Sequence, residues 1–298
     1  MIPYIYLPQF HLGPLTIYTW GFVVSIGLAV AIFVAYRRYK SLALSDATKL
    51  SFDCRVILDL AFWILVAAFI GARLFHVFLY EWPYYRVHLN EIIRIDQGGL
   101  SSFGGLIGAA VAFWFYFKYV ILRRAKRGEG SRANARNADP ASAGRDSSPS
   151  AQNDNLILRY TDLLMFAWPL GHGIGRLGCF LVHMHPGRLS NVPWAVQYPG
   201  GPRLDMGLIE SVVLLSYWVI IALVSKKRVS SPSDGSYVVM GILFYGATRF
   251  VLDFFRATDL PMSDTRYFGL TPAQYGSVAL VLVGIYLWKM SAKQMATD

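Results

Sequence analysis

Long apolar stretches constrain this chain more than any other feature. Seven of them are about 20 residues long, enough for an α-helix to cross the hydrocarbon core of a bilayer. Only 15% of the residues are charged, well below the roughly 25% of an ordinary soluble domain. The sequence therefore predicts an all-α integral membrane protein with about seven transmembrane helices. The predicted spans are roughly residues 15–36, 56–80, 100–122, 158–181, 207–225, 236–256 and 272–291.

Basic side chains collect directly after the odd-numbered spans. Cytoplasmic loops of membrane proteins are enriched in Lys and Arg, so we expect the N-terminus outside and the C-terminus in the cytoplasm. The net charge of +10 is thereby assigned to the cytoplasmic face, and nucleic acid is not an expected partner. The basic clusters are Arg37, Arg38 and Lys40; Arg123, Arg124, Lys126 and Arg127; Lys226, Lys227 and Arg228; and Lys289 and Lys293.

Residues 128–156 differ in composition from the rest of the chain. They are rich in Gly, Ser, Ala, Asn and Asp and contain almost no large apolar side chain. Such a segment cannot bury enough apolar surface to offset the entropy of ordering it. We therefore predict a single membrane domain over residues 1–298, with 128–156 as a disordered cytoplasmic insertion.

Arg176 places a positive charge within a segment that is predicted to cross the membrane. It lies at the end of the fourth predicted span, between Gly175 and Gly178. A guanidinium at membrane depth is costly and usually faces a polar cavity or a ligand. Its planar fork can grip a phosphate through two parallel hydrogen bonds. This pattern favours an anionic lipid headgroup as the ligand.

Further charges are predicted at or near the outer half of the spans. The alternative to a ligand site is a set of structural ion pairs between helices. Arg249 and Asp253 are four residues apart and could neutralise each other without any ligand. The excess of arginines over nearby acids nevertheless favours a phosphate-bearing ligand. The further charges are Arg73, Glu210, Arg249, Asp253 and Arg256.

A glycine-rich stretch straddles the start of the third predicted span. It contains Gly98, Gly99 and Ser101, followed by Gly104 and Gly105. Glycine permits close approach of the backbone, and free N–H groups at a helix start can bind an anion. Glycine pairs are also common where two membrane helices pack, so both interpretations stay open.

Taken together and in this order, the motifs resemble the prolipoprotein diacylglyceryl transferase family. The strongest likeness is Gly175–Gly178, inside a Gly-Arg-x-Gly signature. The likeness spans most of the chain outside 128–156. The matching segments are Leu12–Gly21, Gly71–Arg73, Gly98–Ser101, Asp162, Gly171–Gly178, Arg249–Arg256, Phe268–Thr271 and Gln274.

The resemblance implies a transferase of the bacterial cytoplasmic (inner) membrane that needs no cofactor. The family moves diacylglycerol from phosphatidylglycerol to the lipobox cysteine thiol of a signal-peptide-bearing prolipoprotein, in contact with membrane lipids, and releases glycerol phosphate. The residues implied as catalytic are Arg176 and Arg249, and those implied in substrate binding are Arg73, Gly98, Gly99, Ser101, Gly104, Gly105, Gly175, Gly178, Glu210, Asp253 and Arg256.

The chain departs from the family pattern at the residue that would accept the thiol proton. Phe103 stands where the family carries its catalytic histidine, and Cys179 stands where it carries asparagine. We expect His183 or His185, in the predicted outer loop, to accept the thiol proton instead, because a neutral imidazole titrates near 6.5. The simpler alternative is that these histidines are solvated loop residues.

Two other functions stay open at this point. The loss of the family histidine fits a catalytically degraded relative that binds anionic phospholipid or lipoprotein precursors. The third possibility is an unrelated small transporter, which would more often show broken helices in two repeated halves. No such repeat is evident in the sequence, and the retained arginines favour the transferase.

Overall fold

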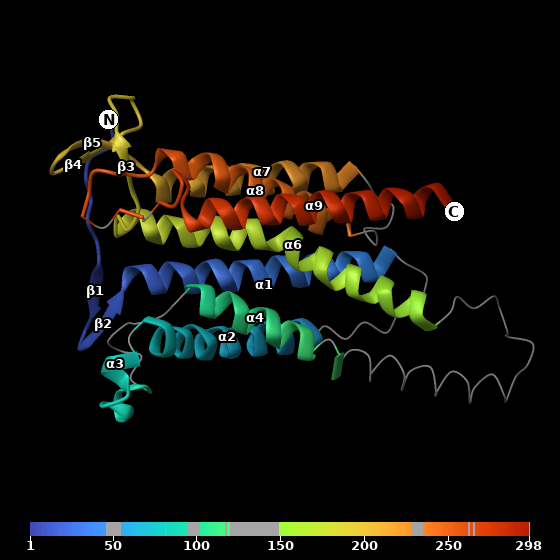
Figure 1. Cartoon of the computed structure of the whole chain (residues 1–298). Helices are drawn as coiled ribbons and strands as arrows, with labels where there is room; N and C mark the ends of the chain where they lie inside the picture. Colours follow the sequence, from blue (N-terminus) through green and yellow to red (C-terminus); the bar gives the residue numbers. More distant parts are fainter. Residues whose placement is uncertain are drawn as a thin grey trace, which may run out of the picture. The chain divides into compact units, whose positions relative to one another are not determined.

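The structure, a computed structural model, describes most of the chain in two compact units. Met1–Asp46 and Leu158–Asp298 form the first unit, and Ala47–Ile157 forms the second. Each unit is described by itself below (Figure 1). The described residues are 1–45, 55–80, 82–93, 102–116, 118–119, 149–227, 235–261, 263–264 and 266–297.

Helices dominate both units, and each predicted span contains one. Among the described residues, four helices are long and apolar enough to cross a membrane: Thr19–Ser41, Leu58–Phe78, Met206–Ser225 and Ser236–Phe255. The prediction of a mainly helical membrane protein is therefore confirmed. The helices are α1 (Thr19–Ser45), α2 (Arg55–Phe75), α4 (Ser102–Tyr116), α6 (Pro149–Leu181), α7 (Met206–Lys227), α8 (Ser236–Leu252) and α9 (Pro272–Thr297).

The first unit also contains short strands that the sequence analysis did not predict. A hairpin of β1 (Gln9–Leu12) and β2 (Leu15–Tyr18) leads directly into α1. A second, antiparallel sheet has the order β3-β5-β4, with strands Pro186–Leu189, Gly201–Asp205 and Val196–Tyr198 respectively. Gly201 has φ +113, a backbone conformation that favours glycine.

The three-stranded sheet marks the end of the first unit where the candidate site lies. In Figure 1, the C-terminal ends of α6 and α8 and the N-terminal ends of α7 and α9 all lie at this end. Strand β5 runs straight into α7, and the Asp205 carboxylate accepts a hydrogen bond from the Leu208 N–H at 3.0 Å. This contact caps the start of α7.

Close packing holds α6 to its neighbours in the first unit. A Cβ on Gly171 would lie 2.8 Å from the carbonyl oxygen of Gly27 on α1, so glycine is what allows the two helices to approach. Away from the sheet, Phe166 packs with Tyr217 and Ile221 of α7. The Tyr217 ring stacks on Phe244 of α8 with 3.8 Å between the centroids.

The second unit is built on the contact between α2 and α4. A Cβ on Gly104 would collide with the carbonyl oxygen of Gly71 and with the side chain of Phe75. Gly105 has more room, because its nearest neighbours, on Ala68 and Ala72, are 3.6 Å away. The sequence left two interpretations open for these glycines, helix packing and anion binding. The contact of Gly104 with α2 explains this glycine by helix packing.

Arg73 serves the same unit. Its guanidinium donates to the backbone carbonyls of Ile92 at 2.8 Å and Glu91 at 2.7 Å. It also lies over the Tyr85 ring, 5.1 Å from the centroid. The arginine thus ties the short helices α3 (Trp82–Tyr85) and η2 (Leu89–Glu91) to the end of α2.

Alanine at the two neighbouring glycines should separate these environments. We expect Gly104→Ala to destabilise the protein by about 1–3 kcal/mol, the usual cost of overpacking. Gly105→Ala should be neutral or stabilising by up to about 1 kcal/mol, because alanine is the better helix former. Thermal unfolding of the purified protein in detergent measures both. Equal unfolding midpoints for the two variants would contradict the packing role of Gly104.

Candidate active site: a buried arginine–carboxylate network

Glu210 on α7 is held between two arginines from neighbouring helices. One carboxylate oxygen pairs with Nη2 of Arg176 on α6, and the other lies 2.5 Å from Nη1 of Arg249 on α8. The side chains of Arg176, Glu210 and Arg249 are only 10%, 6% and 16% exposed. The structure therefore brings together three charges that the sequence analysis placed on separate spans.

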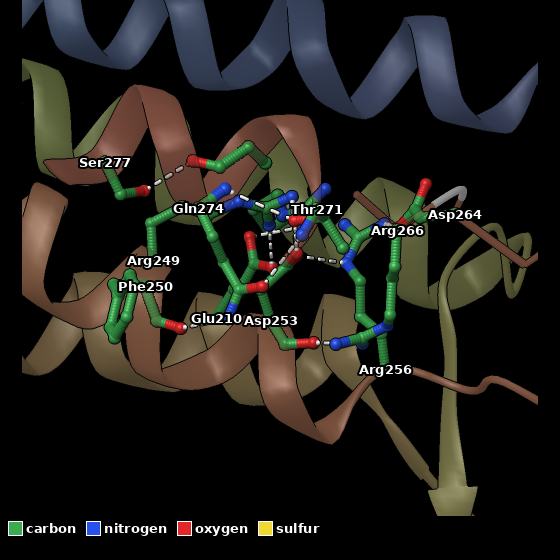
Figure 2. Close-up of polar contacts among 12 residues, drawn as sticks. Glu210, Arg249, Phe250, Asp253, Arg256, Asp264, Arg266, Thr271, Gln274 and Ser277 are labelled. Carbon is green, nitrogen blue, oxygen red and sulfur yellow. Dashed lines mark hydrogen bonds and ion pairs between the residues drawn. The ribbon is translucent and has the colours of Figure 1, made fainter. Parts of the chain in front are cut away.

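Asp253 extends the network at the end of α8. It begins η5 (Asp253–Phe255), and its Oδ1 lies 3.2 Å from Nη2 of Arg249 and 2.9 Å from Nε of Arg256. Figure 2 shows these side chains converging from α7, α8 and the segment that follows α8. The ion pair between Arg249 and Asp253, which the sequence offered as an alternative to a ligand site, is present, and Asp253 also pairs with Arg256.

The start of α9 supports Asp253 from the other side. The Thr271 hydroxyl donates to Asp253 Oδ2. Thr271 N–H donates to Gln274 Oε1 at 2.9 Å, and Gln274 N–H donates to Thr271 Oγ1 at 3.2 Å. This reciprocal pair is a capping box with Pro272 at the first helical position. Both residues lie in segments that the resemblance named, and the Thr-Pro-x-Gln pattern also indicates this helix cap from sequence.

The network is nearly balanced in charge. Arg266 donates to the backbone carbonyl of Asp253 at 3.1 Å, and Arg256 pairs with Asp264 at 2.7 Å. The site therefore holds four arginines against three carboxylates, a smaller positive excess than the sequence suggested. Within the described part of the chain, the buried Nε of Arg176 has no hydrogen-bond partner. A buried donor without a partner is costly and points to an absent acceptor.

The two glycines beside Arg176 face a different neighbour. A Cβ on Gly178 would lie 3.2 Å from the carbonyl oxygen of Trp20, and one on Gly175 would lie 3.5 Å from Val24. Both glycines therefore lie against α1. Cys179 contacts the arginine directly, because Nη1 of Arg176 donates to its sulfur at 3.5 Å.

The two histidines expected as bases occupy different surroundings. His183 Nδ1 lies 2.7 Å from Asp205 Oδ2, and its ring stacks on Tyr4 with 4.3 Å between centroids. His185 is partly buried, and burial and then the charge of Arg176 lower its pKa to about 3. His185 is therefore neutral at pH 7 and close enough to the arginines to feel their charge.

Other predicted site residues lie in the second unit or outside the described residues. Arg73, Gly104 and Gly105 belong to the second unit. Gly98, Gly99 and Ser101 fall outside the described residues. Within the first unit, the network itself consists of Arg176, Glu210, Arg249, Asp253, Arg256, Asp264, Arg266, Thr271 and Gln274.

Known proteins are similar to this chain over most of its length. The family model for prolipoprotein diacylglyceryl transferase matches residues 8–126 and 150–290. Three relatives are named phosphatidylglycerol–prolipoprotein diacylglyceryl transferase. Those of Ectopseudomonas mendocina and Finegoldia magna are each 28% identical and cover 96% of this chain and 95% and 96% of their own lengths. That of Pseudomonas aeruginosa strain LESB58 is 29% identical over 93% of this chain and 90% of its own. The chain therefore belongs to the prolipoprotein diacylglyceryl transferase family.

Proposed function

We propose that this protein transfers diacylglycerol from phosphatidylglycerol to the lipobox cysteine thiol of prolipoproteins. The observation that carries the proposal is the pair of buried arginines, Arg176 and Arg249, on either side of Glu210. Buried guanidinium groups suit a phosphate whose negative charge grows as its ester bond breaks. Family membership over nearly the whole chain supports the same reaction.

The reaction is a displacement at carbon. The thiol sulfur attacks the glyceryl carbon that carries the phosphate ester, and a C–S bond forms while the C–O bond breaks. The electron pair stays on the phosphate oxygen, so glycerol phosphate leaves. The thiol has a reference pKa near 8.5 and must lose its proton to a base or into a positive field.

Arg176 is the arginine with a spare donor for the phosphate. Its Nη2 is committed to Glu210, whereas its buried Nε has no hydrogen-bond partner among the described residues. A guanidinium carries five N–H donors, more than the carboxylate occupies. Glu210 can therefore keep Arg176 and Arg249 at a set spacing while both still bind a phosphate.

Several wider predictions belong to the same proposal. Seven spans, an outer N-terminus and a cytoplasmic C-terminus would place the network on the outer side of the bacterial inner membrane, where secreted prolipoproteins and phosphatidylglycerol meet. The basic clusters and the four apolar helices support this topology. A single membrane domain with an insertion at 128–156 is supported by the family match, which passes over 127–149, although α6 already begins at Pro149.

A catalytically degraded relative that binds anionic phospholipid or lipoprotein precursors is the second candidate. Phe103 favours it, because phenylalanine cannot take the proton that the family histidine takes. The two candidates differ in one measurement. Incubation with phosphatidylglycerol vesicles and a lipobox peptide yields a diacylglyceryl thioether, detected by mass spectrometry, only if the protein is a transferase.

Substitution of Arg176 tests the phosphate assignment. Arg176→Lys keeps the charge but loses the planar fork, and we expect transfer to fall at least about tenfold, or about 1.4 kcal/mol of barrier. Arg176→Ala and Arg249→Ala should lose more. Arg38→Lys is the matched control, because Arg38 binds Ser225 and Tyr237 far along α1 from the network. Wild-type transfer by both alanine variants would refute the assignment.

Removal of the polar insertion tests the domain assignment. Replacing residues 128–148 with a short Gly/Ser linker leaves α6 intact from Pro149. We expect transfer within a few-fold of wild type, because the segment is polar and the proposed chemistry lies on the opposite side of the membrane. Transfer and the amount of membrane-inserted protein are measured together. Complete loss of activity in a well-inserted variant would show that the segment takes part in function.

A further inference from the structure

His183 and Asp205 form a buried pair outside the arginine network. His183 follows α6, and Asp205 ends β5. His183 Nδ1 lies 2.7 Å from Asp205 Oδ2, and the two side chains are 2% and 0% exposed. Asp205 Oδ1 meanwhile accepts the Leu208 N–H at 3.0 Å. The carboxylate therefore orients an imidazole with one oxygen and caps α7 with the other.

Tyr198 adds a third donor to the same carboxylate. Its hydroxyl donates to Asp205 Oδ2 at 2.7 Å. Burial and then the charge of Asp205 raise the pKa of Tyr198, so the phenol stays protonated and remains a donor. Every polar contact of Asp205 described here is thus one in which the carboxylate accepts, which directs the His183 proton to Nδ1.

The other ring nitrogen of His183 is left unused. With the proton on Nδ1, Nε2 carries a lone pair and can act as a base. Nε2 is buried and has no hydrogen-bond partner among the described residues. A buried polar atom in this state calls for an explanation, and a carboxylate–histidine pair with a free Nε2 is the arrangement used for general-base catalysis.

The backbone holds His183 in an uncommon conformation. Its φ of +48 lies in the left-handed region, which costs a β-carbon residue free energy and is found most often at functional sites. The turn is fixed by two hydrogen bonds to the last turn of α6: His183 N–H to Phe180 O and Met184 N–H to Cys179 O, each 3.1 Å. The histidine is therefore positioned on the helix end that carries Arg176.

His185 is a poorer candidate for the same task. Burial and the charges of Arg176, Arg256 and Arg249 lower its pKa to about 3. A base that weak cannot take a proton readily from a thiol with a reference pKa near 8.5. Its neutral ring adds no charge beside the arginines. His185 therefore borders the arginine network without acting as the base.

We infer that His183 is the general base of the transfer and that Asp205 is its positioning residue. The inference rests on the function proposed above. The thiol proton passes to His183 Nε2 as the sulfur attacks the glyceryl carbon, the C–O bond breaks onto the phosphate, and the imidazolium later releases its proton to water. Tyr4 is stacked on the ring and is 36% exposed, so the thiol has to reach Nε2 past this side chain.

His183→Gly is the most direct test. Glycine suits a φ of +48, so the turn is retained while the base is removed. We expect transfer from phosphatidylglycerol to a lipobox peptide to fall about 100-fold, within the range for loss of a general base. Added imidazole should restore part of the activity. His11→Ala, at an exposed histidine of β1, is the matched control and should stay within a few-fold of wild type.

Asp205→Asn tests the positioning residue without removing the helix cap, because asparagine caps as well as aspartate. We expect an unchanged unfolding midpoint, a loss of transfer of at least about tenfold, and a smaller share of the Nδ1–H tautomer in histidine ¹⁵N NMR spectra.

The possible outcomes separate the two proposals. A wild-type protein that transfers no diacylglycerol overturns the function and, with it, the inference. A wild type that transfers while Arg176→Ala does not, together with undiminished transfer by His183→Gly, overturns the inference alone. Loss of activity in His183→Gly without rescue by imidazole, and with an altered unfolding midpoint, also overturns it, because the histidine would then be structural.

Discussion

The interaction on which this site depends is the carboxylate of Glu210 between two buried guanidinium groups. Arg176 and Arg249 come from different helices, and neither could remain charged in a low-dielectric interior without a partner. Glu210 meets both with its two oxygens and so links α6, α7 and α8 at one end. Any substitution that removes the carboxylate leaves two buried like charges close together, which makes Glu210 structural and electrostatic at once.

Support for this centre comes from helix ends rather than helix faces. Asp253 lies where α8 changes to a 3-10 turn, and Thr271 caps α9 while donating to Asp253. Asp205 caps α7 while orienting His183. Residues at helix ends carry backbone groups without intrahelical partners. Here the side chains that accept from those backbone groups, or lie beside them, also contact the residues of the proposed site. Folding of the helix termini and preorganisation of the site are therefore coupled.

The departures from the family pattern suggest a different source for the base. Phe103 lies in α4, which belongs to the second unit, whereas His183 and Asp205 lie in the first. The imidazole of this pair lies in the turn after α6, and its carboxylate partner lies at the end of β5. Under the proposals above, the arginines that would bind the phosphate stay in place, and the proton acceptor comes from another element.

Local sequence determined the helical character of the protein, because apolar runs of about 20 residues report directly on membrane-crossing helices. It also indicated Arg176 and the Arg249–Asp253 pair, since an isolated charge and a four-residue spacing are both visible along the chain. Only the tertiary structure decided that Glu210 bridges two arginines, that Gly104 and Gly178 serve helix packing, and that Asp205 pairs with His183. The physical reason is that each of these contacts joins residues far apart in sequence. The hydrophobic periodicity of one helix does not specify which helix faces and helix ends will meet.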